Sequence, residues 1–192
     1  MKKKIIITGG LGYIGTELCK LYSGVSWNNQ IIVIDNRFIS ERVNQIRNWN
    51  MEFVQGDILD KVLVNKYCKD ANIIHHLAGI TDVPRTKSES SDEKDEKIKL
   101  VAERGTQNIL DVISSKCKVI FPSTHVVYEG IDKVKNNISE DEDLKPMLSY
   151  SSSKAINEKQ LRDSGKNYVI LRLGSVYGYS TDTARIDIMP NL

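Results

Sequence analysis

A tyrosine and a lysine in the second half of the chain are spaced so that they could share proton chemistry. Tyr150 and Lys154 are four residues apart, so on a helix their side chains lie on one face. A free phenol titrates at about pH 10, and lowering its pKa by about three units takes roughly 4 kcal/mol of preferential stabilisation of the phenolate. A neighbouring ammonium group supplies part of that stabilisation. The same spacing is also typical of a solvated helix face, so the surrounding sequence must decide between the two interpretations.

A hydroxyl group is available to complete this pair. Thr124 follows an apolar stretch, residues 118–121, that predicts a strand. It would then lie at the carboxyl edge of the sheet, where open α/β sheets bind ligands. A threonine hydroxyl can both donate and accept a hydrogen bond. We therefore predict a catalytic relay of hydroxyl, phenol and ammonium, formed by Thr124, Tyr150 and Lys154.

Three glycines near the amino terminus predict a place for a second reactant. Gly9, Gly12 and Gly15 stand between an apolar run and a segment with helical spacing that begins at Tyr13 and Ile14. Gly9 permits a tight exit from the strand, Gly12 lets backbone N–H groups approach a pyrophosphate, and Gly15 lets the helix lie close to the sheet. The anion would lie at the positive end of that helix. Strand-to-helix turns also use glycine for purely steric reasons, so the turn alone is weak evidence.

An acidic residue at the end of the next strand strengthens this interpretation. The apolar run 31–34 ends in Asp35-Asn36, with Asp35 twenty residues after Gly15. A carboxylate at that place accepts hydrogen bonds from an adenosine ribose and would repel a 2′-phosphate, which favours NAD over NADP. The combined pattern predicts a dinucleotide site rather than a structural turn followed by an ordinary loop. Oxidised nicotinamide is positively charged, so with Lys154 it would help to acidify Tyr150.

The elements that must position these groups alternate between apolar strands and helices. This alternation predicts an α/β fold, a Rossmann-type doubly wound parallel sheet with helices on both faces. We assign residues 1–180 to an NAD-binding domain and residues 181–192 to the start of a carboxyl-terminal substrate-binding region that is largely missing. Residues 37–50 show no clear periodicity, and residues 85–97 form a charged, mobile lead-in to a long helix that starts at Ile98. The predicted strands are 4–7, 31–34, 52–55, 71–79, 118–121 and 168–171.

Composition argues against several other classes of protein. The 192 residues include 27 Lys and Arg and 25 Asp and Glu, so the formal charge of +2 predicts no general attraction to nucleic acid or membranes. The apolar run at the amino terminus is too short for a secretory signal, and no apolar segment has the length of a membrane span. Cys19, Cys68 and Cys117 are an odd number without CxxC spacing, which predicts reduced, buried thiols. We expect a cytoplasmic protein.

Two adjacent histidines, His75 and His76, do not predict a metal site. On a strand their side chains point to opposite faces, so they cannot ligate one ion together. We expect no metal and interpret both as buried or strand-end histidines.

Together these motifs resemble the extended short-chain dehydrogenase/reductases, and among them the nucleotide-sugar epimerases and dehydratases. The resemblance covers nearly the whole chain, with the signatures in the order of that family. They are the glycine turn 8–15, Asp35-Asn36, Gly56-Asp57-Ile58, the HLAG of 76–79, the STHVVY of 123–128, the YSSSK of 150–154 and the RLGSVYG of 172–178.

The resemblance implies roles for these residues. Tyr150 would be the general base and Thr124 its hydroxyl partner, while Lys154 would also hold the nicotinamide ribose. Asp57 and Ile58 would flank the adenine, and Ala78 and Gly79 would line the cofactor groove. The NAD-binding set that follows is Gly9, Gly12, Tyr13, Ile14, Gly15, Asp35, Asn36, Asp57, Ile58, Leu77, Ala78, Gly79, Tyr150 and Lys154.

Departures from the family pattern narrow the predicted activity. The 4,6-dehydratases have Asp-Glu after the catalytic threonine, whereas this chain has His125 and Val126, which disfavours elimination of water. Ala102 replaces an asparagine that usually precedes Gly105 by three residues, and Ser175 replaces another asparagine. Family members usually continue for roughly a hundred more residues, which form the domain that holds the nucleotide-sugar.

Three functions therefore remain open. The first is an NAD-dependent epimerase of a nucleotide-diphosphate sugar, which oxidises the sugar transiently to a keto-sugar. The second is a reductase or dehydrogenase of similar substrates, which would consume stoichiometric cofactor. The third is a cofactor-binding protein without turnover, or an inactive fragment. The resemblance also implies a homodimer, formed through a bundle of four long helices.

Overall fold

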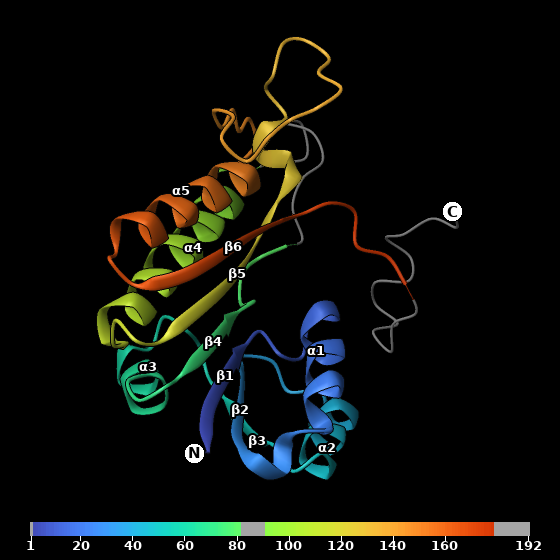
Figure 1. The fold of residues 1–192 in the computed structure, drawn as a ribbon, viewed down its shortest axis with the longest axis vertical. Helices are drawn as coiled ribbons and strands as arrows, with labels where there is room; N and C mark the ends of the chain where they lie inside the picture. Colours follow the sequence, from blue (N-terminus) through green and yellow to red (C-terminus); the bar gives the residue numbers. More distant parts are fainter. Residues whose placement is uncertain (1, 82–90, 179–192) are drawn as a thin grey trace.

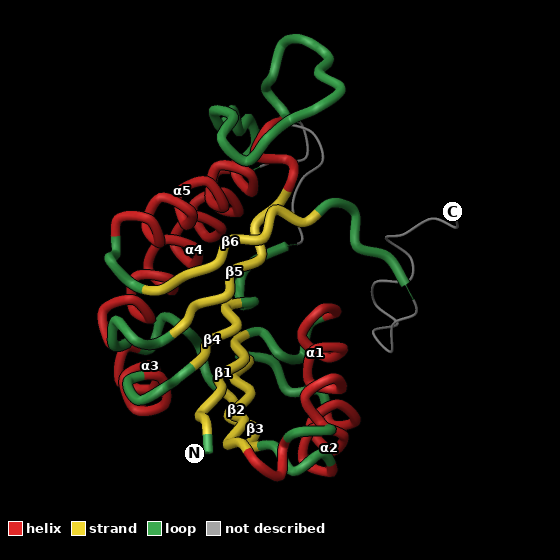
Figure 2. The backbone as a smooth tube through the Cα atoms, viewed as in Figure 1, coloured by secondary structure: helices red, strands yellow, loops and turns green. Residues whose placement is uncertain are grey.

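Six parallel strands form one sheet at the centre of the molecule (Figures 1 and 2). The computed structural model describes residues 2–81 and 91–178. The strands lie in the order β3-β2-β1-β4-β5-β6, which is the order of a doubly wound sheet. Their bounds are β1 Lys3–Thr8, β2 Asn29–Asp35, β3 Glu52–Gln55, β4 Ile73–His76, β5 Lys118–Thr124 and β6 Asn167–Leu173.

Helices cover both faces of this sheet, which confirms the predicted fold class. Helices α1 and α2 lie on one side, and α3, α4 and α5 lie on the other (Figure 1). Their bounds are α1 Tyr13–Ser23, α2 Ser40–Asn48, α3 Lys61–Cys68, α4 Asp92–Val112 and α5 Ser149–Asp163, with short 3-10 helices η1 at Ser26–Asn28 and η3 at His125–Tyr128. Among the described residues, no helix has the length and apolar character needed to cross a membrane. Residues 181–192, the predicted start of a second region, lie outside the described residues.

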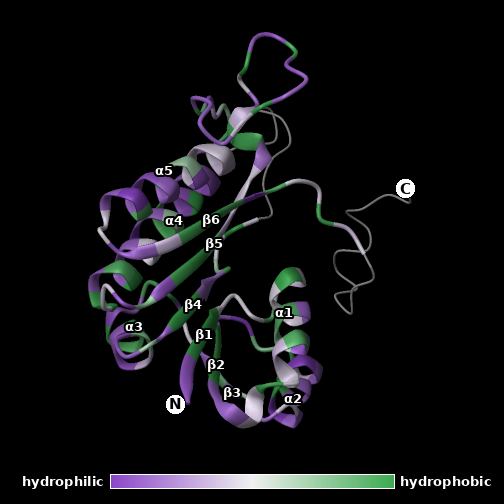
Figure 3. Cartoon of the chain, viewed as in Figure 1, coloured by the Kyte–Doolittle hydropathy of each residue, from purple (hydrophilic) through white to green (hydrophobic). Residues whose placement is uncertain are grey.

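Alternation along the strands divides the apolar interior into two cores. Hydrophobic residues run along the strands at the centre of the molecule, as the green stretches of β5 and β6 in Figure 3 show. In β1, Ile5 and Ile7 pack with α1 and α2, while Ile6 packs with the helices on the opposite face. All three are almost fully buried, as expected for a parallel sheet covered on both faces. Cys19 belongs to the first core and Cys68 and Cys117 to the second, which confirms the prediction of buried thiols.

The structure has a helix where the sequence shows no clear periodicity. Helix α2 occupies most of the segment 37–50, and the apolar side chains of Val43 and Ile46 are fully buried beneath it. Their separation by three residues is the helical signal. Apart from Arg42, which is also buried, the rest of the helix is polar and largely faces solvent, which conceals that signal in the sequence.

The long helix begins earlier than Ile98, the predicted start. Helix α4 starts at Asp92, and the Ser91 hydroxyl caps it by accepting a hydrogen bond from the Lys94 N–H at 3.4 Å. Acidic residues in its first turn favour the positive end of the helix dipole, so the charged segment 92–97 is helical. The earlier part of that predicted lead-in, residues 85–90, lies outside the described residues. The fourth strand is shorter than predicted, because only Ile73–His76 pairs with its neighbours.

Strands β1 and β4 are neighbours in the sheet. From β1 the chain continues to β2 and β3 on one side, and from β4 it continues to β5 and β6 on the other side. We call the carboxyl ends of β1 and β4, together with the turns that follow them, the switch point. Sheets of this order bind ligands at such a position, because no connection crosses it. The glycine turn follows β1, and residues 77–79 follow β4. Both predicted cofactor segments therefore lie at the switch point.

Candidate active site

The glycine turn lies directly against the segment that follows β4. Gly9 has a φ of 70°, a backbone conformation that favours glycine. A Cβ atom on Gly9 would stand 2.7 Å from the backbone nitrogen of Ala78, and one on Gly15 would stand 2.5 Å from the Gly9 carbonyl oxygen. Larger residues at either position would separate the turn from the sheet or from its helix. The predicted steric roles of Gly9 and Gly15 fit these contacts.

Helix α1 begins in this turn without a side-chain cap. Gly12 is the N-cap residue, and its carbonyl oxygen accepts the first helical hydrogen bond, from the Thr16 N–H at 2.9 Å. The N–H groups of Tyr13, Ile14 and Gly15 precede that bond, so helix geometry gives them no partner within α1. Uncapped N–H groups at the positive end of a helix fit a phosphate. The turn therefore has the donors that a pyrophosphate needs.

Asp35 lies at the end of β2 and points toward the glycine turn. The Asp35 side chain is 5% exposed. One oxygen accepts a hydrogen bond from the Leu11 N–H at 3.0 Å, and the other accepts from the backbone N–H of Arg37 at 3.0 Å and from its Nε at 3.3 Å. Arg42 holds the peptide group that follows, because its guanidinium donates to the Leu11 carbonyl. The turn is thus fixed by one acidic and one basic side chain.

The ends of β2 and β3 bring two further predicted residues together. The Asn36 side-chain amide donates to the carboxylate of Asp57 at 3.2 Å. Ile58 behaves differently, because it is only 5% exposed and its side chain packs against Gly105 of α4. Asp57 therefore lies at the rim of the sheet, whereas the side chain of Ile58 faces the core.

Residues 77–79 run beside the end of β1. The Leu77 N–H donates to the Thr8 carbonyl at 3.1 Å, and the Ala78 N–H donates to the Thr8 hydroxyl at 3.2 Å. Gly79 is exposed, and a Cβ atom there would meet nothing within 4 Å. All three predicted residues thus line the switch point opposite the glycine turn.

Lys154 joins α5 to the end of β5. Its ammonium group donates to the Pro122 carbonyl at 2.9 Å and lies 4.5 Å from the centre of the Phe121 ring. The same ammonium lies 5.9 Å from the centre of the Tyr150 ring, so the predicted tyrosine and lysine do share a helix face. Burial lowers the pKa of Lys154 to about 8, although the negative charge of Glu158 acts in the opposite direction.

Thr124 and Tyr150 lie at the same edge of the sheet. Thr124 is the last residue of β5 and is 8% exposed, and its hydroxyl accepts a hydrogen bond from the Val126 N–H at 3.3 Å. Tyr150 is the second residue of α5 and is partly buried. The bond from Lys154 to Pro122 ties the Tyr150 helix to the strand two residues before Thr124.

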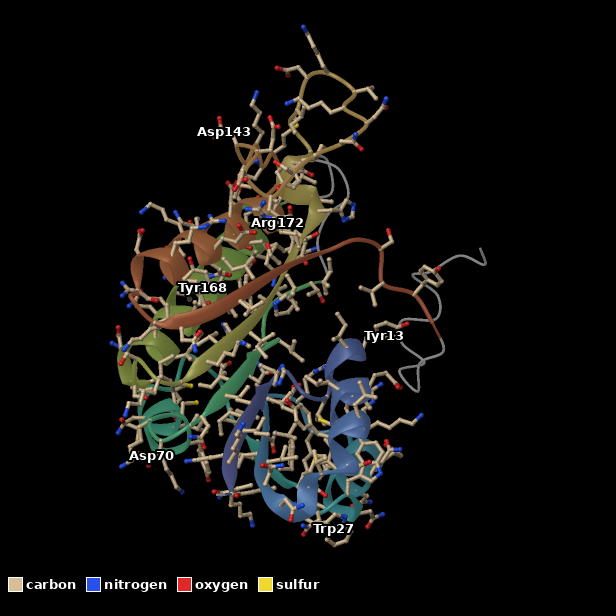
Figure 4. All side chains as sticks on the ribbon, in the orientation of Figure 1. Tyr13, Trp27, Asp70, Asp143, Tyr168 and Arg172 are labelled. Atoms are coloured by element: carbon tan, nitrogen blue, oxygen red, sulfur yellow. The ribbon has the colours of Figure 1, made fainter. Side chains whose placement is uncertain are left out.

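A buried ionic cluster that the sequence analysis did not identify fixes α5 against β5 and β6. Glu158 is fully buried and accepts hydrogen bonds from the Ser123 hydroxyl at 2.6 Å and from two nitrogens of Arg172, at 2.8 Å and 3.0 Å. Burial alone would raise the pKa of Glu158, but the bonds from Arg172 and Ser123 lower it below the usual value. Arg172 lies in the upper part of Figure 4. Glu158 follows Lys154 by four residues, so on a helix it lies on the same face as Tyr150 and Lys154. This spacing could have identified Glu158 as a neighbour of the site.

A second buried chain of polar groups crosses the molecule beneath the switch point. The two ring nitrogens of His76 lie 2.9 Å from the hydroxyls of Thr8 and Thr106. Asn157 of α5 donates to the Thr106 hydroxyl at 3.0 Å and to the Ala102 carbonyl at 2.9 Å. Burial, and to a lesser extent the charge of Lys154, lowers the pKa of His76 to about 3, so the ring is neutral. No sequence motif identifies Asn157.

The neighbouring histidine faces the other way, as predicted. The Nε2 atom of His75 forms a hydrogen bond of 2.7 Å with the Tyr22 hydroxyl of α1. Helix α1 lies on the opposite face of the sheet from the partners of His76. The two rings therefore have different surroundings and do not face a common point.

A cavity of about 500 Å³ opens beyond the ends of β5 and β6. His125 and Val126, which follow Thr124, line it together with Tyr128, Glu129 and Arg172. His125 is exposed, and its Nδ1 lies 3.2 Å from the Leu173 carbonyl of β6. The cavity therefore begins one residue beyond the predicted relay.

Comparison with known proteins points to one family. The sequence model of the NAD-dependent epimerase/dehydratase family matches residues 5–190. A dTDP-D-glucose 4,6-dehydratase from Dictyostelium discoideum is 30% identical over 92% of the chain, and a CDP-paratose 2-epimerase from Salmonella typhi is 30% identical over 91%. The crystal structure of a UDP-glucose 4-epimerase from Brucella ovis, in complex with NAD, is 30% identical and superposes with a TM-score of 0.71 over 88% of the chain.

The match covers only part of each of these proteins. The chain spans 44% of the length of the dehydratase, 58% of the length of the 2-epimerase and 51% of the crystallised 4-epimerase. It therefore corresponds to about half of each relative.

Proposed function

Because the chain belongs to the NAD-dependent epimerase/dehydratase family, we propose that it binds NAD and epimerises the sugar of a nucleotide-diphosphate sugar. The observation that carries this proposal is the position of Lys154. Its ammonium lies beside the Tyr150 ring and is bonded to the strand that ends at Thr124. The glycine turn, Asp35 and residues 77–79 lie at the same edge of the sheet, where the cofactor is expected.

NAD fits the residues at the switch point. The N-terminus of α1, with Tyr13 and Ile14, would hold the pyrophosphate, and Asp35 and Asn36 would hold the adenosine ribose. Asp57 would lie beside the adenine, while Ala78 and Gly79 would face the nicotinamide half. When bound, oxidised NAD accepts a hydride from a sugar carbon and later returns it.

The chemistry assigned to the chain itself is proton transfer. Tyr150, as the phenolate, takes the proton of the sugar hydroxyl whose carbon gives up the hydride, and a keto-sugar results. Lys154 stabilises the phenolate with its positive charge, and Thr124 holds the sugar oxygen with its hydroxyl. Tyr150 returns the proton once the ketone has turned over and its other face receives the hydride. The configuration at one carbon is then inverted without net redox change.

The residues after Thr124 support epimerisation over dehydration. Elimination of water needs an acid and a base beside the sugar, and the 4,6-dehydratases place Asp-Glu there. His125 and Val126 supply no carboxylate at those positions. The exposed His125 ring faces the Leu173 carbonyl, at the mouth of the cavity.

A reductase or dehydrogenase would use the same groups, and cofactor stoichiometry separates it from an epimerase. An epimerase converts an excess of nucleotide-sugar without accumulating NADH, whereas a dehydrogenase produces one NADH for each product molecule. Absorbance at the NADH band during conversion of UDP-, CDP- and dTDP-sugars measures this difference.

Replacement of Tyr150 tests whether the chain is an enzyme. The Tyr150→Phe variant keeps the ring and its packing but has no ionisable hydroxyl. We expect it to bind NAD with unchanged affinity and to lose about 10²- to 10⁴-fold in the rate of sugar conversion. If the wild type and the variant bind NAD equally and neither converts any nucleotide-sugar, the catalytic proposal fails. A cofactor-binding protein without turnover is then the better assignment, and the methyl side chain of Ala102 in α4 favours it.

Two further assignments are proposals of the same kind. We infer a homodimer formed by α4 and α5, because Leu100 of α4 is 50% exposed on that side of the molecule. Size-exclusion chromatography with light scattering would distinguish a dimer of 21.7 kDa chains from a monomer. We also propose a cytoplasmic location, which the reduced and buried cysteines support.

A further inference from the structure

Arg37 adds a positive charge to the adenosine end of the candidate site. It follows Asp35 by two residues, and its Nε lies 3.3 Å from one carboxylate oxygen. The Arg37 side chain is 51% exposed, so its guanidinium reaches the surface. One of its terminal nitrogens lies 3.9 Å from the place where a Cβ atom on Gly12 would stand. The guanidinium therefore lies between the Asp35 carboxylate and the glycine turn.

The hydrogen bonds of Asp35 leave little room for a ribose diol. A carboxylate has about four acceptor positions. Three N–H groups already occupy Asp35: those of Leu11, of the Arg37 backbone and of the Arg37 side chain. A ribose with free 2′- and 3′-hydroxyls offers two donors, so holding both would displace the Arg37 side chain. A ribose that carries a 2′-phosphate offers only its 3′-hydroxyl and needs a cation for the phosphate.

Asp57, the other acidic side chain of this region, also has hydrogen-bond partners within the protein. One oxygen of Asp57 accepts from the Asn36 amide at 3.2 Å, and the other accepts from the Leu59 N–H at 2.9 Å. Asp35 and Asp57 thus both already accept hydrogen bonds from protein N–H groups, and Arg37 lies beside the first of them. Its ion pair with Asp35 offsets the repulsion that an isolated carboxylate would exert on a phosphate.

We propose that the adenosine site accepts a 2′-phosphate, and that Arg37 is the residue that recognises it. The ligands of this class are NADP and nucleotides with a 2′-phosphoadenosine group. A planar guanidinium donates two parallel hydrogen bonds to a phosphate, which suits this task better than an ammonium does. The inference rests on the proposed cofactor site, and it changes the expectation that Asp35 excludes NADP. Both cofactor forms would bind, with Arg37 moving aside for NAD and staying in place for NADP.

Two small nucleotides isolate this contact in a binding experiment. 5′-AMP and 2′,5′-ADP differ only in the 2′-phosphate, and neither needs the nicotinamide half of the site. Isothermal titration calorimetry would give their Kd values, with those of NAD and NADP, for the wild type, Arg37→Gln and Arg47→Gln. Arg47 is an exposed arginine in the last turn of α2, away from the contacts of Asp35 described above, so Arg47→Gln is the matched control for the loss of one charge.

The wild type should bind 2′,5′-ADP at least as tightly as 5′-AMP. In Arg37→Gln, 2′,5′-ADP and NADP should bind about ten- to hundredfold more weakly. 5′-AMP and NAD should bind as tightly as before or more tightly, because no arginine has to move aside for them. The control should match the wild type for all four ligands. Added salt should weaken binding of 2′,5′-ADP more than that of 5′-AMP, because the contact is ionic and partly exposed.

Two results would overturn this assignment. One is a wild type that binds 5′-AMP and NAD but binds 2′,5′-ADP and NADP more than about tenfold less tightly. The other is an Arg37→Gln variant in which all four ligands weaken equally. If the folded wild type binds none of the four, the cofactor site itself is wrong, and the proposed function fails with it.

Discussion

Lys154 combines a buried position with a charge that the proposed chemistry requires. Its pKa is lowered to about 8 because burial disfavours the ammonium form. Near neutral pH the group still carries its proton and can stabilise the Tyr150 phenolate. Above pH 8 it increasingly loses that proton, so the acidity of Tyr150 should decrease.

This shift can be measured without turnover. We expect one lysine resonance in protein labelled with ¹³C-lysine to titrate at about pH 8, well below the ordinary lysine value of about 10.4. The Lys154→Met variant, which keeps most of the aliphatic stem, should lack that resonance. A wild-type spectrum in which all lysines titrate above pH 10 would contradict the environment described for Lys154.

Gly9 provides a second prediction at the scale of one residue. Its φ of 70°, and the 2.7 Å that would separate an added Cβ from the Ala78 nitrogen, make Gly9→Ala strained and crowded. We expect a loss of about 1–3 kcal/mol or more in the free energy of unfolding, measured by urea denaturation. Gly24→Ala is the control, because Gly24 has a φ of −66° and nothing lies within 4 Å of its added Cβ. That variant should be neutral or more stable by up to about 1 kcal/mol.

The sequence predicts some site residues well, and the reason is local. Tyr150 and Lys154 lie on one turn of a helix, and the glycines follow one another in a single turn, so short spacing determines their geometry. Arg42 and Asn157 act across long separations: Arg42 holds Leu11, and Asn157 holds Ala102. Only the packed fold brings such partners together, so spacing cannot predict them.

At the scale of elements, α5 is held by contacts on several sides. Glu158 binds the ends of β5 and β6, Lys154 binds the Pro122 carbonyl, and Asn157 binds α4. The helix that carries Tyr150 is thus fixed relative to the strand that carries Thr124. Rigid support of this kind keeps catalytic groups in register.

The Asn157→Ala variant measures one of these attachments. It would leave the buried Thr106 hydroxyl and the partly buried Ala102 carbonyl without the amide donor, at a cost of about 1–3 kcal/mol in unfolding free energy. Asn65→Ala is the control, because Asn65 is exposed on α3 and its replacement should change stability by less than about 0.5 kcal/mol. Equal stabilities of the two variants in urea denaturation would show that the Asn157 contacts contribute nothing net.

The predicted elements differ from the observed ones where polar residues dominate. The buried strands contain runs of Ile and Val, and all six appear in the structure at the expected places. Helix α2 and the first turns of α4 are rich in polar residues. The sequence features that indicate a helix there are the buried pair Val43 and Ile46 in α2 and the capping residue Ser91 before α4. Hydrophobic periodicity is weak in such helices because only a narrow stripe is buried.

The whole molecule contains both walls of the proposed cofactor site. The sheet is continuous from β3 to β6. Tyr13, labelled in Figure 4, lies at the start of α1, and its hydroxyl donates to the Gly178 carbonyl beyond β6 at 2.9 Å. We therefore expect the 192-residue chain to bind NAD by itself. At a concentration of about 100 times Kd, NAD adds about 2.7 kcal/mol to stability.

This stabilisation would raise the Tm by about 5–10 °C for a domain of this size, measured by differential scanning calorimetry. Nicotinamide mononucleotide is the control ligand, because it lacks the adenosine that Asp35 and Asn36 would hold. An unchanged Tm at millimolar NAD would contradict a self-contained cofactor site. The part of the site that holds the sugar could not be predicted to the same depth, since the chain corresponds to about half of each relative.

Alkylation of the three buried thiols can report local unfolding of the core. Burial raises the pKa of Cys19 and Cys68 to about 12 and that of Cys117 to about 11. At pH 8 about one thiol in a thousand or fewer is then a thiolate, so iodoacetamide should leave the folded protein unmodified. Each alkylation event marks a fluctuation that exposes one core, and mass spectrometry can assign it to a cysteine. Cys19 samples one face of the sheet and the other two sample the opposite face, so their relative labelling times reveal whether the two halves of the interior loosen together or in succession.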